Sequence, residues 1–461
     1  MGFLYNREVQ STIYFHGGAG SVTGANFLLE SGDIKFLVDC GLAQGRHNAE
    51  EDNWKPFAYV PSEIPLLIVT HAHIDHIGRI PKLVKDGFRG KILSTEVTRA
   101  IAEPLLMDSM TLLAHDAIKH GREELYNEKD IRDALSLWEA IPYHEKYEIG
   151  GGFTAEFLDA GHILGSAMVK ITRAGKTMVF TGDLGGGNSP LLAPHEKVSE
   201  VDYLLMESVY GDRIRTNDED HVKQLAEAIE DIAEKKGTLL IPAFSTERTQ
   251  DILFEIRGLM QEKKVPSMPV YVDSPLAEKV TAAFLSYPQY FSKEMQERVR
   301  GGEKIFSFAE LHIIESAETS REISTKPGPK VIIAGSGMSN GGRVHGHEKL
   351  ILPDPNSTVL IVGYQAAGSL GRRLVEGDKN VLIQGERVRV NAKIELVYGY
   401  SAHMDSAQLL DFVGEVAGTV KQVFVVMGEP SASGFLAQRI RDYLGVKAVA
   451  PAAGEKATIE L

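Results

Sequence analysis

The side chains best suited to chemistry lie close together, directly after the apolar run Leu66–Val69. Three histidines and an aspartate occur there within six residues, namely His71, His73, Asp75 and His76. The chain has a single cysteine, Cys40, so a metal site within one chain must use imidazole and carboxylate ligands, which zinc accepts. A buried strand that ends in such a loop therefore predicts a metal site.

Two more ligand candidates follow other predicted strands. His162 comes after Phe153–Leu158, and Asp183 comes after Thr177–Phe180. Together with the first four side chains they supply the ligands that two metal ions would need.

A weak internal repeat surrounds two of the aspartates. A Gly-Ser pair, an apolar strand, a glycine turn and an aspartate loop occur in this order up to Asp39, and again up to Asp183. Two similar β-rich halves predict two sheets packed face to face, each of which ends in an aspartate loop.

From about residue 210 the sequence pattern changes to α/β. Several apolar strands each run into a small or polar loop, and helical segments follow, which predicts a parallel sheet that binds ligands at the carboxyl ends of its strands. The strands are Leu239–Pro242, Val270–Val272, Val331–Ile333 and Val359–Val362.

Loops of this second region carry side chains and amides suited to phosphate. The stretch 336–343 is rich in glycine, which lets backbone amides approach an anion, and Ser245 precedes a predicted helix N-terminus. Each loop alone is typical of an ordinary turn, but their convergence on one sheet edge favours a phosphodiester chain. The candidate substrate-binding residues are Ser245, Arg248, Ser336, Gly337, Met338, Arg343 and Arg372.

Composition limits the classes of protein. With 461 residues, 43% of them hydrophobic, the chain can bury two cores. No stretch approaches the roughly 20 apolar residues of a membrane span, and no signal peptide is visible, so we expect a cytoplasmic enzyme that does not bind membranes.

A net charge of −14 argues against a broad basic face for nucleic acid, but an enzyme that grips a few nucleotides needs only local donors and metal ions.

The histidine motif with His162 and the Gly182-Asp183 loop resembles the metallo-β-lactamase superfamily across residues 1–205. The resemblance implies an αββα sandwich with metals at one edge. It assigns His71, His73 and His162 to one zinc, Asp75 and His76 to a second, and Asp183 as a bridge between them. Asp39 would orient ligand histidines, and the alternative is an aspartate that caps a turn.

Residues Met206–Arg213, the α/β region and Gly399–Asp405 resemble the β-CASP nucleases, in particular the cleavage and polyadenylation endonuclease group and its prokaryotic relatives. This implies a metallo-β-lactamase domain formed by residues 1–209 and 388–461, with an inserted parallel α/β β-CASP domain at 210–387. Glu207 would hold His403 as the acid that protonates the leaving oxygen, while Asp75 and Asp183 help to hold the metals that activate the attacking hydroxide. The alternatives are an ordinary glutamate at a strand end and a surface histidine.

One position departs from the family pattern. Where the family has a metal-binding histidine after a late strand, this chain has Met427 after Gln422–Val426. A thioether is a poor zinc ligand beside nitrogen and oxygen, so we expect a weaker second site, or manganese in it.

The predicted function is a zinc-dependent ribonuclease that cleaves single-stranded RNA internally and that can also have exonuclease activity. The sequence leaves open whether the protein forms a homodimer. A DNA nuclease on the same scaffold, a small-ester hydrolase and a non-catalytic nucleic-acid-binding protein remain as alternatives.

Overall fold

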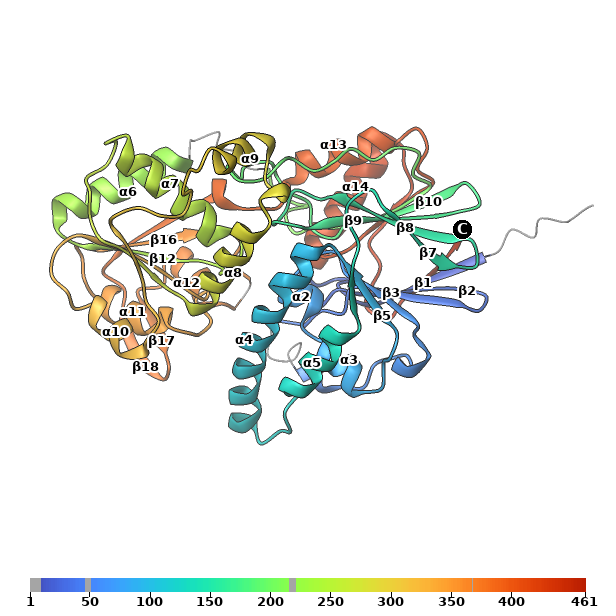
Figure 1. Cartoon of the computed structure of the whole chain (residues 1–461), viewed down its shortest axis with the longest axis horizontal. Coiled ribbons are helices and arrows are strands. Elements are labelled where there is room, and N and C mark those ends of the chain that lie inside the picture. The colour runs from blue at the N-terminus through green and yellow to red at the C-terminus, as the bar shows by residue number, and fades with distance from the viewer. Residues whose placement is uncertain (1–9, 46–50, 215–220, 367) are drawn as a thin grey trace, which may run out of the picture. The chain divides into compact units, whose positions relative to one another are not determined.

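The computed structural model of the chain describes residues 10–45, 51–214, 221–366 and 368–461. The chain forms two compact units, drawn in Figure 1. The first unit consists of residues 1–187, 194–214 and 403–461, and the second of residues 188–193 and 215–402. None of the helices in the described segments is long and apolar enough to cross a membrane.

The first unit is built on two sheets, each with seven strands within the described residues. In spatial order, the first sheet contains β22 (Lys456–Glu460), β1 (Gln10–Gly17), β2 (Asn26–Ser31), β3 (Ile34–Val38), β4 (Leu66–Ile68), β5 (Lys91–Ser94) and β6 (Trp138–Ala140). The second contains β21 (Ala448–Val449), β20 (Gln422–Val425), β11 (Tyr203–Met206), β10 (Lys176–Phe180), β9 (Ala167–Arg173), β8 (Phe153–Asp159) and β7 (Lys146–Gly150).

An aromatic core lies between the two sheets. Successive side chains of a strand point to opposite faces, so in β1 the alternate residues Ile13 and Phe15 both face the core. Phe15 meets Phe424 of the other sheet with ring centroids 5.5 Å apart. This alternation of buried and less buried positions is what makes the two sheets pack as layers.

Helices cover the outer faces of the two sheets (Figure 1). Apolar residues of α13 (Ser406–Val416) and α14 (Pro430–Leu444), among them Leu409, Phe412 and Leu436, pack with residues of the second sheet in a separate core. The helices of the first unit are α2 (Ile74–Ile77), α3 (Ile80–Lys85), α4 (Glu96–His120), α5 (Glu128–Ser136), α13 (Ser406–Val416) and α14 (Pro430–Leu444). The predicted αββα sandwich is confirmed.

Two hairpins correspond to the predicted repeat, and each leads into an aspartate loop. The β2–β3 hairpin turns at Gly32, whose φ is 60°, and Asp39 follows β3. The β9–β10 hairpin turns at Ala174 and Gly175 with φ of 48° and 79°, and Asp183 follows β10. Positive φ at Gly32 in the first turn, and at both residues of the second turn, matches the twist of the flanking strands, so these turns set the register that delivers the aspartates.

The second unit is built on a parallel sheet, as predicted. Its strands in spatial order are β14 (Leu311–Ile313), β13 (Val270–Asp273), β15 (Lys330–Ala334), β12 (Thr238–Pro242), β16 (Thr358–Val362) and β19 (Lys393–Val397). A hairpin of β17 (Asn380–Ile383) and β18 (Glu386–Arg389) lies outside this sheet. The helices are α6 (His221–Lys235), α7 (Arg248–Gln261), α8 (Pro275–Ser286), α9 (Lys293–Arg300), α10 (Ala317–Ile323), α11 (Val344–Ile351) and α12 (Leu370–Val375).

The limits of the second unit differ from the predicted insertion at 210–387. Strand β19 pairs in parallel with β16, so the chain returns to the first unit at residue 403 rather than 388. A short, partly exposed strand such as β19 has the same pattern in either sheet, and only its pairing partner decides where it belongs.

One acid of the second unit, Glu348, is buried and has no cation paired with it among the described residues. Glu348 on α11 is 0% exposed, and neither of its carboxylate oxygens has a hydrogen-bond partner among the described residues. Burial in these surroundings raises the pKa of Glu348 to about 8. The folded chain therefore keeps the proton at pH values where the unfolded chain has lost it.

The Glu348→Gln variant should unfold at a higher temperature than the wild type at pH 8, but not at pH 4. The pKa is raised in the folded state, so the wild type loses stability as pH rises from the unfolded pKa towards the folded one, by about 1.4 kcal/mol per pH unit. Thermal unfolding between pH 4 and 8 measures this, with exposed Glu278→Gln as the control. Parallel melting curves for wild type and Glu348→Gln would contradict the assignment.

Candidate metal centre

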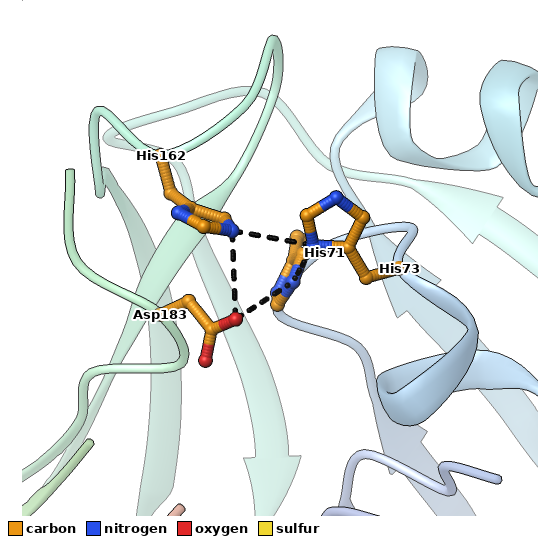
Figure 2. Close-up of side chains that lie close together, drawn as sticks. All are labelled: His71, His73, His162 and Asp183. Carbon is orange, nitrogen blue, oxygen red and sulfur yellow. Dashed lines mark hydrogen bonds and ion pairs between the residues drawn. The ribbon is translucent and has the colours of Figure 1, made fainter. Parts of the chain in front are cut away.

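Loops from both sheets of the first unit bring four ligand-type side chains together (Figure 2). His71 and His73 lie between β4 and α2, His162 follows β8, and Asp183 follows β10. One ligand atom from each of the four lies within 4.8 Å of all the others. The strands end at a common edge of the two sheets, which is why residues so far apart in sequence meet.

The distances within this group fit a tetrahedral metal ion. The Nδ1 atom of His73 lies 3.1 Å from Nε2 of His71 and 3.2 Å from Nε2 of His162. Oδ2 of Asp183 lies 3.5 Å from the first of these Nε2 atoms and 3.4 Å from the second. Metal bonds of 2.0–2.1 Å give tetrahedral ligand separations of about 3.3–3.4 Å, so the donor set fits zinc.

A second group lies on the other side of the Asp183 carboxylate. Its Oδ1 atom is 3.4 Å from Nε2 of His76, and this Nε2 is 3.9 Å from Oδ2 of Asp75. Both Nε2 of His76 and Oδ1 of Asp183 are buried without a hydrogen-bond partner among the described residues. The two oxygens of Asp183 thus face two groups of ligand-type side chains.

Asp39 fixes the orientation of two of these histidines. Its Oδ2 accepts hydrogen bonds from Nδ1 of His76, at 2.8 Å, and from the Thr70 hydroxyl, at 2.9 Å. Because the Thr70 proton goes to Asp39, the Thr70 oxygen accepts from Nδ1 of His71, at 3.0 Å. Both rings then carry their proton on Nδ1 and keep the Nε2 lone pair for a metal.

The electrostatics of the site suit a cation. Burial, together with the neighbouring histidines, holds the pKa values of His73 and His162 well below their usual range, so both rings are neutral ligands. Burial opposes a charge on His76, but the carboxylates of Asp183 and Asp39 outweigh it and hold the pKa of His76 well above its usual range. These carboxylates therefore hold a positive charge at this position, which a metal ion would supply in place of the proton.

Glu207 and His403 form a buried pair beside the metal ligands. Glu207 follows β11, and both of its carboxylate oxygens lie 3.1 Å from Nδ1 of His403. Its Oε1 also accepts from the backbone N–H of Leu184, at 2.6 Å. Burial opposes a charge on His403, but Glu207 raises the pKa of His403 to about 9. The His403 ring lies with its centroid 4.6 Å from that of His162.

This pair also has the composition of a metal site. One atom each of Asp183, Glu207 and His403 lie within 4.8 Å of one another. The geometry thus allows His403 to act as a proton donor or as a ligand, and metal content after its removal distinguishes the two.

Met427 lies in the apolar core between the two sheets. It has a left-handed φ of 46° and its N–H donates to the Gly18 carbonyl. A Cβ atom at Gly18 would lie 2.5 Å from the Met427 sulfur, so the glycine makes room for this side chain.

In the second unit, several predicted substrate-binding loops gather at the carboxyl ends of the strands. The hydroxyl of Ser245, after β12, lies 3.1 Å from that of Ser274, after β13. The Gly337 carbonyl, after β15, accepts from the Gln365 side chain, after β16. The Met338 carbonyl accepts from the N–H of Gly371 in α12. Ser245, Ser336, Gly337 and Met338 therefore belong to one cluster of loops.

The three predicted substrate-binding arginines are held by protein groups. Arg248 pairs with Asp251 at 2.8 Å, and Arg372 pairs with Glu376 at 2.6 Å. Arg343 donates to Asp273 at 2.6 Å and to the carbonyls of Ile314 and Glu315.

Sequence reasoning missed Asp273, which joins several segments of the second unit. It also accepts from Nε2 of His347 at 2.6 Å and from the hydroxyl of Ser320. The one signal in the sequence is an aspartate at the end of a strand, and its partners come from distant segments.

Comparison with known proteins extends these observations. Residues 20–243 match the metallo-beta-lactamase superfamily, residues 249–374 the Beta-Casp domain, and residues 387–451 the Zn-dependent metallo-hydrolase RNA specificity domain. The chain is 35% identical to Ribonuclease TTHA0252 of Thermus thermophilus, over 86% of this chain and 89% of that protein. It is 31% identical to Transcription termination factor FttA of Methanosarcina mazei, over 94% of this chain and 69% of that protein.

A solved structure from Enterococcus faecalis, described as a protein of unknown function, has the same fold with a TM-score of 0.57 and 11% sequence identity. The match covers 98% of this chain and 100% of that one. The matched domains and the similar proteins show that the chain belongs to the β-CASP family of the metallo-β-lactamase superfamily.

Proposed function

We propose that this protein is a metal-dependent ribonuclease that hydrolyses phosphodiester bonds of single-stranded RNA. The observation that carries the proposal is the Asp183 carboxylate between two groups of metal-ligand side chains, with the Glu207–His403 pair directly beside them. The match to an RNA specificity domain and the similarity to a protein named as a ribonuclease support RNA as the substrate.

The residues of this chain divide the work between them. His71, His73 and His162 would hold one metal ion, Asp75 and His76 a second, and Asp183 would contact both. Bound there, the ions would supply an activated nucleophile and neutralise phosphoryl oxygen charge.

His403 would supply the proton for the leaving group. Its Nδ1 donates to Glu207, so its Nε2 carries the proton that can pass to the leaving oxygen. With a pKa of about 9, the ring holds this proton at neutral pH.

In the second unit, Ser245 and the amides of Ser336, Gly337 and Met338 would contact the phosphate backbone. Contacts from Arg248, Arg343 and Arg372 stay predictions, as do zinc in both sites, internal cleavage, a homodimer and a cytoplasmic location.

The Asp39→Asn variant should bind zinc about 10- to 100-fold more weakly than the wild type. An amide nitrogen facing Nδ1 of His76 would push the ring proton to Nε2 and remove the lone pair that binds metal. Competition with a chromophoric chelator measures the affinity, and exposed Asp33→Asn is the matched control. If Asp39 only caps a turn, metal affinity will not change.

The His403→Ala variant should keep its metal content and cleave RNA about 10² to 10⁴ times more slowly, the usual contribution of a positioned acid. Single-turnover cleavage and metal analysis measure the two effects, with exposed His312→Ala as the control. Loss of metal would make His403 a ligand, and an unchanged rate would remove it from the chemistry.

A second variant tests the pair. The wild-type rate should fall at high pH as His403 loses its proton. The Glu207→Gln variant lacks the carboxylate that raises the pKa of His403, so its cleavage rate should begin to fall at a lower pH than that of the wild type.

The Met427→His variant should melt at a lower temperature and gain no metal affinity, because an imidazole without a partner would replace an apolar side chain in the core. Wild type should hold one zinc tightly and a second less tightly. Zinc titration, melting temperature and cleavage rate are measured together, with Met427→Leu as the control. Tighter binding of the second zinc with faster cleavage would instead place residue 427 at the metal.

A cleavage assay on matched single-stranded RNA and DNA tests the substrate. Cleavage of RNA alone supports the proposal, whereas preferential cleavage of DNA would favour a DNA nuclease on the same scaffold.

A further inference from the structure

Helix α14 exposes two aromatic side chains on one face. Phe435 is 48% exposed and Tyr443 is 72% exposed, and they are the aromatic members of the large exposed apolar side chains within the described residues. They stand eight positions apart, about 12 Å along the helix axis. The buried face of α14, which includes Leu436 and Ile440, packs in the core.

Arg439 lies between the two rings. Its guanidinium carbon is 6.0 Å from the Phe435 ring centroid and 5.7 Å from the Tyr443 ring centroid. Within the described residues its hydrogen bonds involve Nη1, which donates to the backbone carbonyl and the hydroxyl of Ser406. The three side chains at 435, 439 and 443, called the α14 strip below, thus present an aromatic, a cationic and an aromatic group in line.

The α14 strip is tied to the segments that carry Glu207 and His403. The hydroxyl of Ser406, three residues after His403, also donates to the carbonyl of Gly211, four residues after Glu207. A Cβ at Gly211 would lie 2.7 Å from the carbonyl oxygen of Ala432, so this loop packs directly on α14. Through Ser406 the strip is therefore joined to the segments that carry Glu207 and His403.

The chemistry of the strip suits a single-stranded nucleic acid better than a protein. A helix that docks into a protein groove needs apolar residues at neighbouring turns, but exposed Gln438 and Asp442 and the cation of Arg439 lie between the two rings. Bases stack on exposed aromatic rings, and the guanidinium between the two rings attracts the phosphates that join the bases.

We propose that Phe435, Arg439 and Tyr443 form a stacking surface for single-stranded RNA that extends binding beyond the metal centre. The proposal rests on the proposed function and deepens it. RNA that is long enough would bind at both places, whereas a short oligonucleotide would reach the metal centre alone.

The test compares wild type with Phe435→Ala/Tyr443→Ala on oligoribonucleotides of about 4 and about 16 nucleotides. Loss of one stack weakens binding at least about fivefold, so KM for the longer RNA should rise tenfold or more, with kcat unchanged and with no change on the shorter RNA. Fluorescence anisotropy on the same oligonucleotides measures affinity independently of cleavage. The Gln438→Ala variant is the matched control on the same helix, and Tyr443→Phe, which keeps the ring, should bind like wild type.

An unchanged KM and affinity for the longer RNA would overturn the inference. So would an equal loss on both lengths with a lower melting temperature, which would mark a structural role, or a change of oligomeric state in sedimentation, which would make the strip an interface between copies. If wild type binds RNA without cleaving it, the proposed function fails, but the affinity comparison still decides the inference. If wild type binds neither oligonucleotide, both fail.

Discussion

The site depends on one buried carboxylate that has to be neutralised. Asp183 is 3% exposed, and its oxygens face nitrogens of His71, His76 and His162 from three directions. A buried charge is costly unless it is paired, and here the surrounding donors are rings that also bind metals. The two sheets must pack in register for this to happen, because one supplies the histidine loop and the other supplies Asp183 and His162.

The same carboxylate–histidine interaction occurs twice in the site. In each case a buried carboxylate binds Nδ1 of a histidine and thereby leaves Nε2 for function. Asp39 does this for His76, whose Nε2 faces the position of a metal, and Glu207 does it for His403. The surroundings of the two rings differ: the carboxylates of Asp183 and Asp39 hold the pKa of His76 well above its usual range, whereas Glu207 raises the pKa of His403 to about 9.

The three arginines that the sequence predicts to bind substrate are engaged by acids of the same chain. Arg248, Arg343 and Arg372 each pair with a carboxylate, so the loops of the second unit offer an anion mainly their hydroxyls and amides. Such contacts suit a chain held at a few points rather than along a broad basic face, in line with a net charge of −14. Aromatic rings such as those of α14 add affinity without charge.

The sequence by itself determined the candidate ligands and the two fold types, because each candidate ligand follows a strand that is recognised from its local pattern. The histidine loop follows one strand within a few residues, and the periods of strands and helices can be read along the chain. Only the tertiary structure decided what depends on distant partners. In the folded chain Arg343 pairs with Asp273, 70 residues away, and β19 pairs with β16. Met427 packs in the core against Gly18. In each case the local pattern allows several neighbours, and the packing of the folded chain selects one.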